Sequence, residues 1–79
     1  MKKFEVGQKY NFICWFTGGN TLYTVEYRTQ TKVSFKTVAN EMDGVHEGIE
    51  EFEIDVDEFG NESILIYEYH GHKAQIYAE

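Results

Sequence analysis

The feature that most constrains the fold of this chain is a repeated alternation between residues 21 and 38. Every second residue from Tyr23 to Tyr27 is apolar or aromatic, and the same alternation returns at Val33 and Phe35. A period of two is typical of strands that bury one face and expose the other. A short polar segment separates the two stretches, so the sequence predicts an antiparallel β-hairpin here.

Further short strands are expected on both sides of this hairpin. The polar segment Asn40–Gly48 contains an Asp-Gly pair, which predicts a connection rather than a strand. No helical period continues over ten residues. The remaining predicted strands are Tyr10–Phe16, Ile49–Val56, Ser63–Tyr69 and Ala74–Ala78. The chain of 79 residues is therefore expected to form one domain, residues 1–79. Its predicted fold class is all-β, a small, partly open antiparallel barrel of five or six strands.

The alternation also predicts which side chains are buried. The first strand is apolar on both faces, which predicts either a central position in the sheet or a bend between two layers. In the strand Ile49–Val56, the side chains of Phe52, Ile54 and Val56 are expected to point inward. The predicted core consists of Phe12, Cys14, Tyr23, Val25, Tyr27, Val33, Phe35, Phe52, Ile54, Ile64, Ile66 and Ile76.

Several short motifs resemble those of a known group of proteins. They are F-x-V-G-x-x-Y at Phe4–Tyr10, V-x-Y-R-T at Val25–Thr29, K-V-S-F at Lys32–Phe35, and the closing segment Gly60–Glu79. Together they resemble small SH3-like β-barrel proteins of gut bacteria and their phages or plasmids. The resemblance implies an SH3-like barrel and a gene carried on a mobile element, and it implies no activity.

Charge is divided unevenly along the chain. Residues 1–40 carry six basic and two acidic side chains, a net charge of +4, whereas residues 41–79 carry one basic and twelve acidic ones, a net charge of −11. Such asymmetry marks either an interaction surface or neighbouring strands that pair opposite charges across a sheet. We expect the second arrangement.

The acidic half contains a regular row of carboxylates. Glu51, Glu53, Asp55 and Asp57 alternate with apolar residues, so they are expected on one outer strand face. Their spacing is then about 6.6 Å, from a rise of roughly 3.3 Å per residue. Phosphates follow one another at a comparable spacing along DNA. This row is therefore either a solvated face that protects a sheet edge from aggregation or a partner face that imitates DNA.

Metal binding has one weak candidate. His70 and His72 flank a glycine turn, and Glu68 or His46 offers a further ligand. Imidazole suits zinc, nickel or copper, but residues two apart converge on one ion only in a particular turn geometry. We expect two solvated histidines, no metal and no other cofactor.

Nucleic acid binding also has a candidate, in a group of basic and aromatic side chains. Small barrels bind single strands by stacking bases on aromatic rings beside basic groups. The residues of that kind here are Arg28, Lys32, Lys36, Tyr23 and Tyr27. An acidic chain without a broad basic footprint does not favour nucleic acid as a partner.

No catalytic arrangement is evident. The single Cys14 has no histidine near it in sequence, and it allows no internal disulfide. The two lysines at the start precede no apolar stretch, so neither a signal peptide nor a membrane span is expected. The sequence therefore predicts a non-enzymatic, small cytoplasmic interaction or accessory protein whose partner is another protein. It favours no particular oligomeric state. The alternatives are an acidic DNA-mimicking inhibitor of a nucleic-acid-binding protein and, after that, a single-strand nucleic-acid-binding module.

Overall fold

The computed structural model describes residues 1–14, 19–41 and 43–79, and in these ranges the chain forms seven strands and no helix. The strands are β1 (Lys9–Ile13), β2 (Asn20–Arg28), β3 (Lys32–Glu41), β4 (Gly44–Glu53), β5 (Asp55–Val56), β6 (Glu62–Tyr69) and β7 (His72–Tyr77). One antiparallel sheet has the order β1-β2-β3-β4, and the other has the order β5-β6-β7. The all-β prediction is confirmed. The predicted number of five or six strands is wrong. The predicted strand Ile49–Val56 is interrupted at Ile54, so that its residues belong to two strands, β4 and β5.

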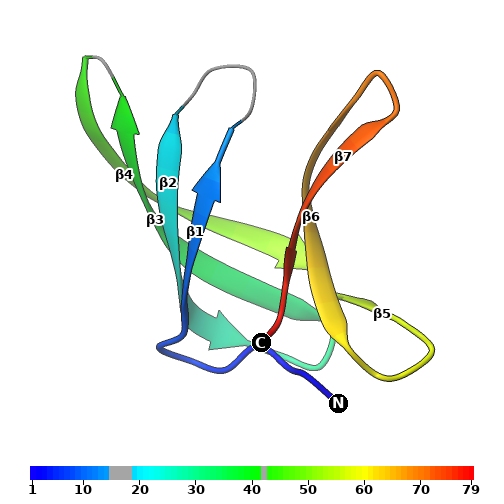
Figure 1. The fold of residues 1–79 in the computed structure, drawn as a ribbon. Helices are drawn as coiled ribbons and strands as arrows, with labels where there is room; N and C mark the ends of the chain where they lie inside the picture. Colours follow the sequence, from blue (N-terminus) through cyan, green and yellow to red (C-terminus); the bar gives the residue numbers. More distant parts are fainter. Residues whose placement is uncertain (15–18, 42) are drawn as a thin grey trace.

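The two sheets face each other and diverge toward the ends of their hairpins (Figure 1). The β6–β7 hairpin stands opposite β1 and β2, while β3 and β4 curve beneath both, and the two chain termini lie near the same end. The radius of gyration is 12.8 Å, somewhat above the value of about 11.6 Å expected for a compact domain of this length. The projecting hairpins account for the difference. The part of the chain that the structure describes contains no membrane-spanning helix.

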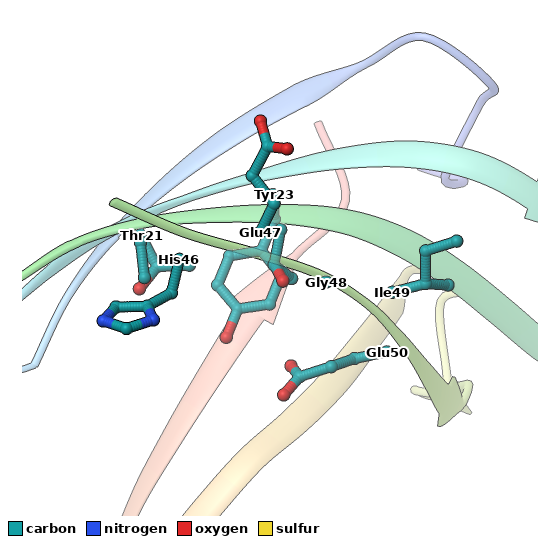
Figure 2. Close-up of a pocket in the computed structure, with 9 residues that line it drawn as sticks. Thr21, Tyr23, His46, Glu47, Gly48, Ile49 and Glu50 are labelled. Carbon is teal, nitrogen blue, oxygen red and sulfur yellow. The ribbon is translucent and has the colours of Figure 1, made fainter. Parts of the chain in front are cut away.

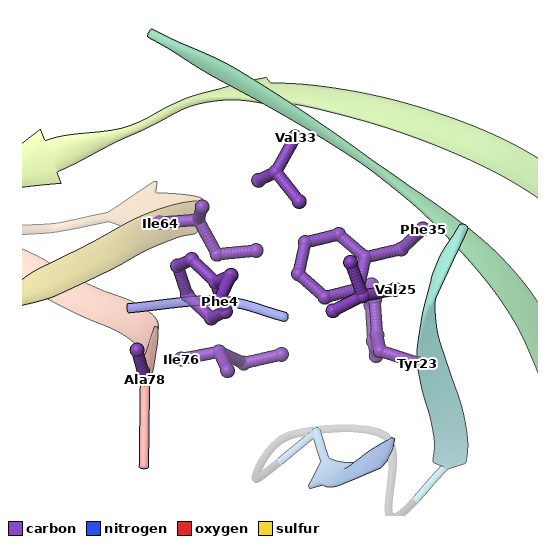
Figure 3. Close-up of a cluster of buried hydrophobic side chains, with 8 residues drawn as sticks. All are labelled: Phe4, Tyr23, Val25, Val33, Phe35, Ile64, Ile76 and Ala78. Atoms are coloured by element: carbon purple, nitrogen blue, oxygen red, sulfur yellow. The ribbon is translucent and has the colours of Figure 1, made fainter. Parts of the chain in front are cut away.

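The core lies where the sheets approach each other, and both contribute to it (Figure 3). Its buried side chains are Phe4, Tyr23, Val25, Val33, Phe35, Ile64, Ile76 and Ala78. The Phe35 ring packs edge-to-face against Phe4 and Tyr23, with centroid distances of 5.6 Å and 5.7 Å. Such contacts stabilise the core in addition to the burial of apolar area.

Six of the twelve predicted core residues are buried, and Phe12, Cys14, Phe52, Ile54 and Ile66 are half-buried.

The burial of Tyr27 was predicted wrongly, and a β-bulge explains why. Val25 pairs with Phe35, but Tyr27 pairs with Ser34, so Glu26 is an extra residue in β2. An extra residue reverses the alternation that follows it. Tyr27 therefore points outward and is 62% exposed, while Arg28 turns toward the interior.

Strand positions differ from the prediction at two further places. β1 is an edge strand rather than a central one. Ile13 is 63% exposed, because none of the described strands covers the outer face of this sheet. Trp15 and Phe16 lie outside the described residues. The predicted connection Asn40–Gly48 is instead the end of β3 and the beginning of β4, which pair as far as Glu41 and Gly44.

Candidate functional site

The four carboxylates predicted to form one row occupy three different elements. Glu51 and Glu53 belong to β4, Asp55 belongs to β5, and Asp57 lies in the turn after β5. The single-strand row is wrong because Ile54 leaves the β4 ladder. Its amide donates a hydrogen bond of 2.8 Å to the carbonyl of Thr31, and the chain then enters the other sheet.

Asp57 has a structural role in the β5–β6 turn. Its carboxylate accepts hydrogen bonds from the amides of Asn61 and Phe59, at 2.9 Å and 2.8 Å. These bonds, the one from Asn61 most of all, lower the pKa of Asp57 because they stabilise its charged form. The carboxylate remains exposed to solvent.

Among the four carboxylates of the predicted row, one forms an ion pair with a lysine of the neighbouring strand. Strands β3 and β4 are neighbours, as expected, and Lys32 Nζ lies 3.7 Å from Glu51 Oε1. Lys36, however, lies opposite Ile49 in the ladder. Within the described ranges, no cationic side chain forms an ion pair with Glu53 or Asp55. The negative charges of Glu53 and Asp55 are therefore left uncompensated at the surface.

A groove of about 430 Å³ lies on the four-stranded sheet (Figure 2). Its lining residues come from β2, β3 and β4, and include Thr21, Tyr23, Thr37, His46, Gly48 and Glu50. In the ladder Tyr23 is opposite Thr37, and Thr37 is opposite Gly48. Figure 2 shows the polar ends of Tyr23, His46 and Glu50 on one side of β4. Glu47 and Ile49 are directed to the other side of the strand, and they also line the groove.

Tyr23 is protonated at neutral pH. Burial raises its pKa to about 12, and the negative charge of Glu50 adds to this rise. Figure 2 shows the Glu50 carboxylate and the Tyr23 hydroxyl on the same side of β4. Sequence analysis missed this groove, because it assigned residues 40–48 to a connection. The alternation of His46, Gly48 and Glu50 on one strand face was the available signal.

The histidines are distributed over separate parts of the molecule. His46 Nε2 lies 3.0 Å from Asp43 Oδ1 near the β3–β4 turn. His70 is in the β6–β7 turn, where its ring contacts that of Tyr69 at a centroid distance of 4.2 Å, and His72 begins β7. The β3–β4 hairpin, which carries His46, and the β6–β7 hairpin, which carries His70 and His72, end far apart in Figure 1. Among the described residues, no three His, Cys, Asp or Glu side chains gather in a way that could hold a metal ion.

The candidate nucleic-acid-binding side chains are divided between the surface and the interior. Lys32, Lys36 and Tyr27 are exposed on the outer face of the four-stranded sheet. Tyr23 is buried in the core, and Arg28 is engaged in an ion pair with Glu62. Two of the five residues are therefore not available for stacking on bases or pairing with phosphates.

Cys14 lies beside an aromatic residue of the opposite sheet. Its Sγ is 3.8 Å from the hydroxyl of Tyr67, which also packs against Phe12 at a ring centroid distance of 6.0 Å. Desolvation, with the contact to Cys14, raises the pKa of Tyr67. These contacts join β1 to β6 and place the thiol half inside the protein.

The sequence and the structure were compared with known families, curated proteins and solved structures. The chain matches no protein-family model, and neither curated proteins nor solved structures show significant similarity to it.

Proposed function

We propose that the protein is a non-enzymatic interaction protein that binds a basic partner protein through its acidic surface. The single observation that carries this proposal is the uncompensated charge of Glu53 and Asp55, described above. Both side chains are exposed, and they lie on consecutive elements, β4 and β5. A concentrated charge of one sign raises the rate of encounter with a partner of the opposite sign. We further propose that the protein acts in the cytoplasm.

The finer fold assignment is part of the same proposal. We regard the two sheets as the halves of a partly open SH3-like barrel. In support, the chain passes directly from β4 to β5 through Ile54, and both sheets share one core. The barrel would be open between β1 and β7, the outer strands of the two sheets. This arrangement is in keeping with the resemblance to SH3-like proteins of mobile elements.

DNA mimicry is the second candidate, and one observation favours it. Glu51 and Glu53 remain alternate residues on the outer face of β4, where a spacing of about 6.6 Å is expected. A partner that normally binds nucleic acid would then recognise these carboxylates in place of phosphates. Asp55 and Asp57 would belong to the same surface without continuing the row.

A pull-down from the native host tests the proposal. The bait is the tagged protein, compared with the double variant Glu53→Lys/Asp55→Lys. The matched control is Glu5→Lys/Glu26→Lys, which changes the net charge equally at exposed positions of the basic half. We expect the first variant alone to lose the partner. Retention of every partner by that variant would overturn the proposal, and displacement of a captured partner by duplex DNA would indicate the mimic.

A further inference from the structure

The groove on the four-stranded sheet has features that the acidic-surface proposal does not use. Its lining residues Thr37, Gly48 and Glu50 share one face of the sheet, whereas Glu53 alternates to the other face of β4. We infer that this groove binds the ammonium group of a primary amine, with Glu50 as the counter-charge and the Tyr23 and Thr37 hydroxyls as further acceptors. This inference does not depend on the proposed function, because the two concern different residues.

The first argument concerns two buried hydroxyl groups. Tyr23 is 5% exposed and Thr37 is 9% exposed, and both line the groove. Neither hydroxyl forms a hydrogen bond with any of the described residues. In those residues no completely covered side-chain nitrogen or oxygen lacks a partner, so both hydroxyl oxygens keep some exposed surface. Buried polar groups usually have partners, and these two are positioned to receive one from a ligand.

The second argument concerns the space in front of these hydroxyls. Gly48 is opposite Thr37 in the ladder, and a Cβ atom at Gly48 would lie 3.4 Å from Thr37 Oγ1. Gly48 does not have a left-handed φ angle, so its backbone conformation does not require glycine. Glycine within a strand is unfavourable, and it often marks a place where a ligand approaches closely. The missing side chain leaves the Thr37 hydroxyl accessible.

The third argument concerns charge. Glu50 follows Gly48 on the same face of β4, opposite Phe35 in the ladder. Its carboxylate lies on the same side of β4 as the Tyr23 hydroxyl, as Figure 2 shows. No Lys or Arg lines the groove, and in the part of the chain that the structure describes Glu50 forms no ion pair. The groove therefore carries negative charge, which excludes anionic ligands.

These features match the chemistry of an ammonium group. An ammonium group has three hydrogen-bond donors and no acceptor. Glu50, Tyr23 and Thr37 all line the groove and offer three acceptors, and a volume of about 430 Å³ holds a small alkyl chain in addition. Two sources supply this group, a free amine or the side chain of a lysine in a peptide, and an experiment distinguishes between them.

The test is an NMR titration of the intact protein at pH 7 with three small probes of similar size. n-Butylammonium is expected to shift the signals of Tyr23, Thr37 and Gly48, whereas 1-butanol and butyrate leave them unchanged. Equal shifts with 1-butanol would overturn the inference, because they would reveal an apolar groove only. Nα-acetyl-lysine methylamide then separates the sources. Weaker binding than n-butylammonium indicates a free amine, and equal or tighter binding indicates a lysine side chain. A failure of both amines to shift these signals contradicts the inference.

Three variants locate the site. Glu50→Gln should weaken n-butylammonium binding roughly tenfold or more, since charged hydrogen bonds are strong. Glu53→Gln, on the other face of β4, should leave the affinity unchanged. Equal weakening by both variants would indicate general electrostatic attraction and overturn the inference. Gly48→Val fills the groove and should abolish binding while the protein remains folded. Retained binding by a folded Gly48→Val protein would also exclude this site.

Discussion

Arg28 on β2 holds the carboxylate of Glu62 on β6 with both terminal nitrogens of its guanidinium group. The Nη2–Oε2 distance is 2.9 Å, and Nη1 also donates to the carbonyl of Phe4 at 2.8 Å. Glu62 accepts a further bond of 2.9 Å from the amide of Phe4. The pair therefore connects both sheets and the N-terminal segment. Since Glu62 is only 4% exposed, its charge depends on these partners.

Removing the guanidinium group should destabilise the fold strongly. Arg28→Met leaves Glu62 buried without its counter-charge, and we expect the free energy of unfolding at pH 7 to fall by roughly 3 kcal/mol. Urea unfolding measures the loss. The control is Lys32→Met, which breaks the exposed pair with Glu51 and should cost less than about 1 kcal/mol. Equal losses in the two variants would contradict this role for Arg28.

The same pair should make stability depend on pH. The hydrogen bond from Arg28 lowers the pKa of Glu62, although burial opposes it. The folded-state pKa is therefore below the unfolded value of about 4.3. The stabilisation is complete above the unfolded pKa and is lost as the pH falls through the folded pKa. We expect the difference in unfolding free energy between wild type and Arg28→Met to shrink from pH 7 to pH 3. A constant difference in urea unfolding at the two pH values would refute this linkage.

Phe35 should be among the most costly core positions. It is 0% exposed, so Phe35→Ala removes a fully buried ring and should lower the unfolding free energy by roughly 3–5 kcal/mol. A loss of this size could unfold so small a domain. Phe59→Ala is the matched control, since Phe59 is 71% exposed and its loss should change stability by no more than about 0.5 kcal/mol. A Phe35→Ala protein that melts like wild type in circular dichroism would show that this face is not the core.

The β6–β7 turn should require glycine at its second position. His70 and Gly71 have φ angles of 49° and 79°, the left-handed conformation that a two-residue type I′ turn needs at both positions. Gly71→Ala should therefore lower the unfolding free energy by about 1 kcal/mol. Gly48→Ala, in a strand without a left-handed φ, should leave it unchanged or raise it. Thermal unfolding of both variants measures the contrast, and destabilisation of the same size in both would argue against a specific turn requirement.

The sequence by itself determined the all-β class, the central hairpin and much of the core. Alternation at Tyr23, Val25, Val33 and Phe35 predicted both strands and buried faces correctly, because the period of two follows from the pleat of any strand. The polar segment before Lys32 also predicted the turn. These features depend on residues near one another in the chain, so they can be read locally.

Only the tertiary structure decided the features that depend on pairing between distant segments. The bulge at Glu26 exposed Tyr27 and turned Arg28 inward, where Glu62 balances its charge across the two sheets. Ile54 divided the acidic row between two sheets by bonding to the β2–β3 turn. The groove arose from the alignment of β2, β3 and β4. A one-residue shift in register moves every following side chain to the other face, and that register is set by the whole core rather than by any single stretch of sequence.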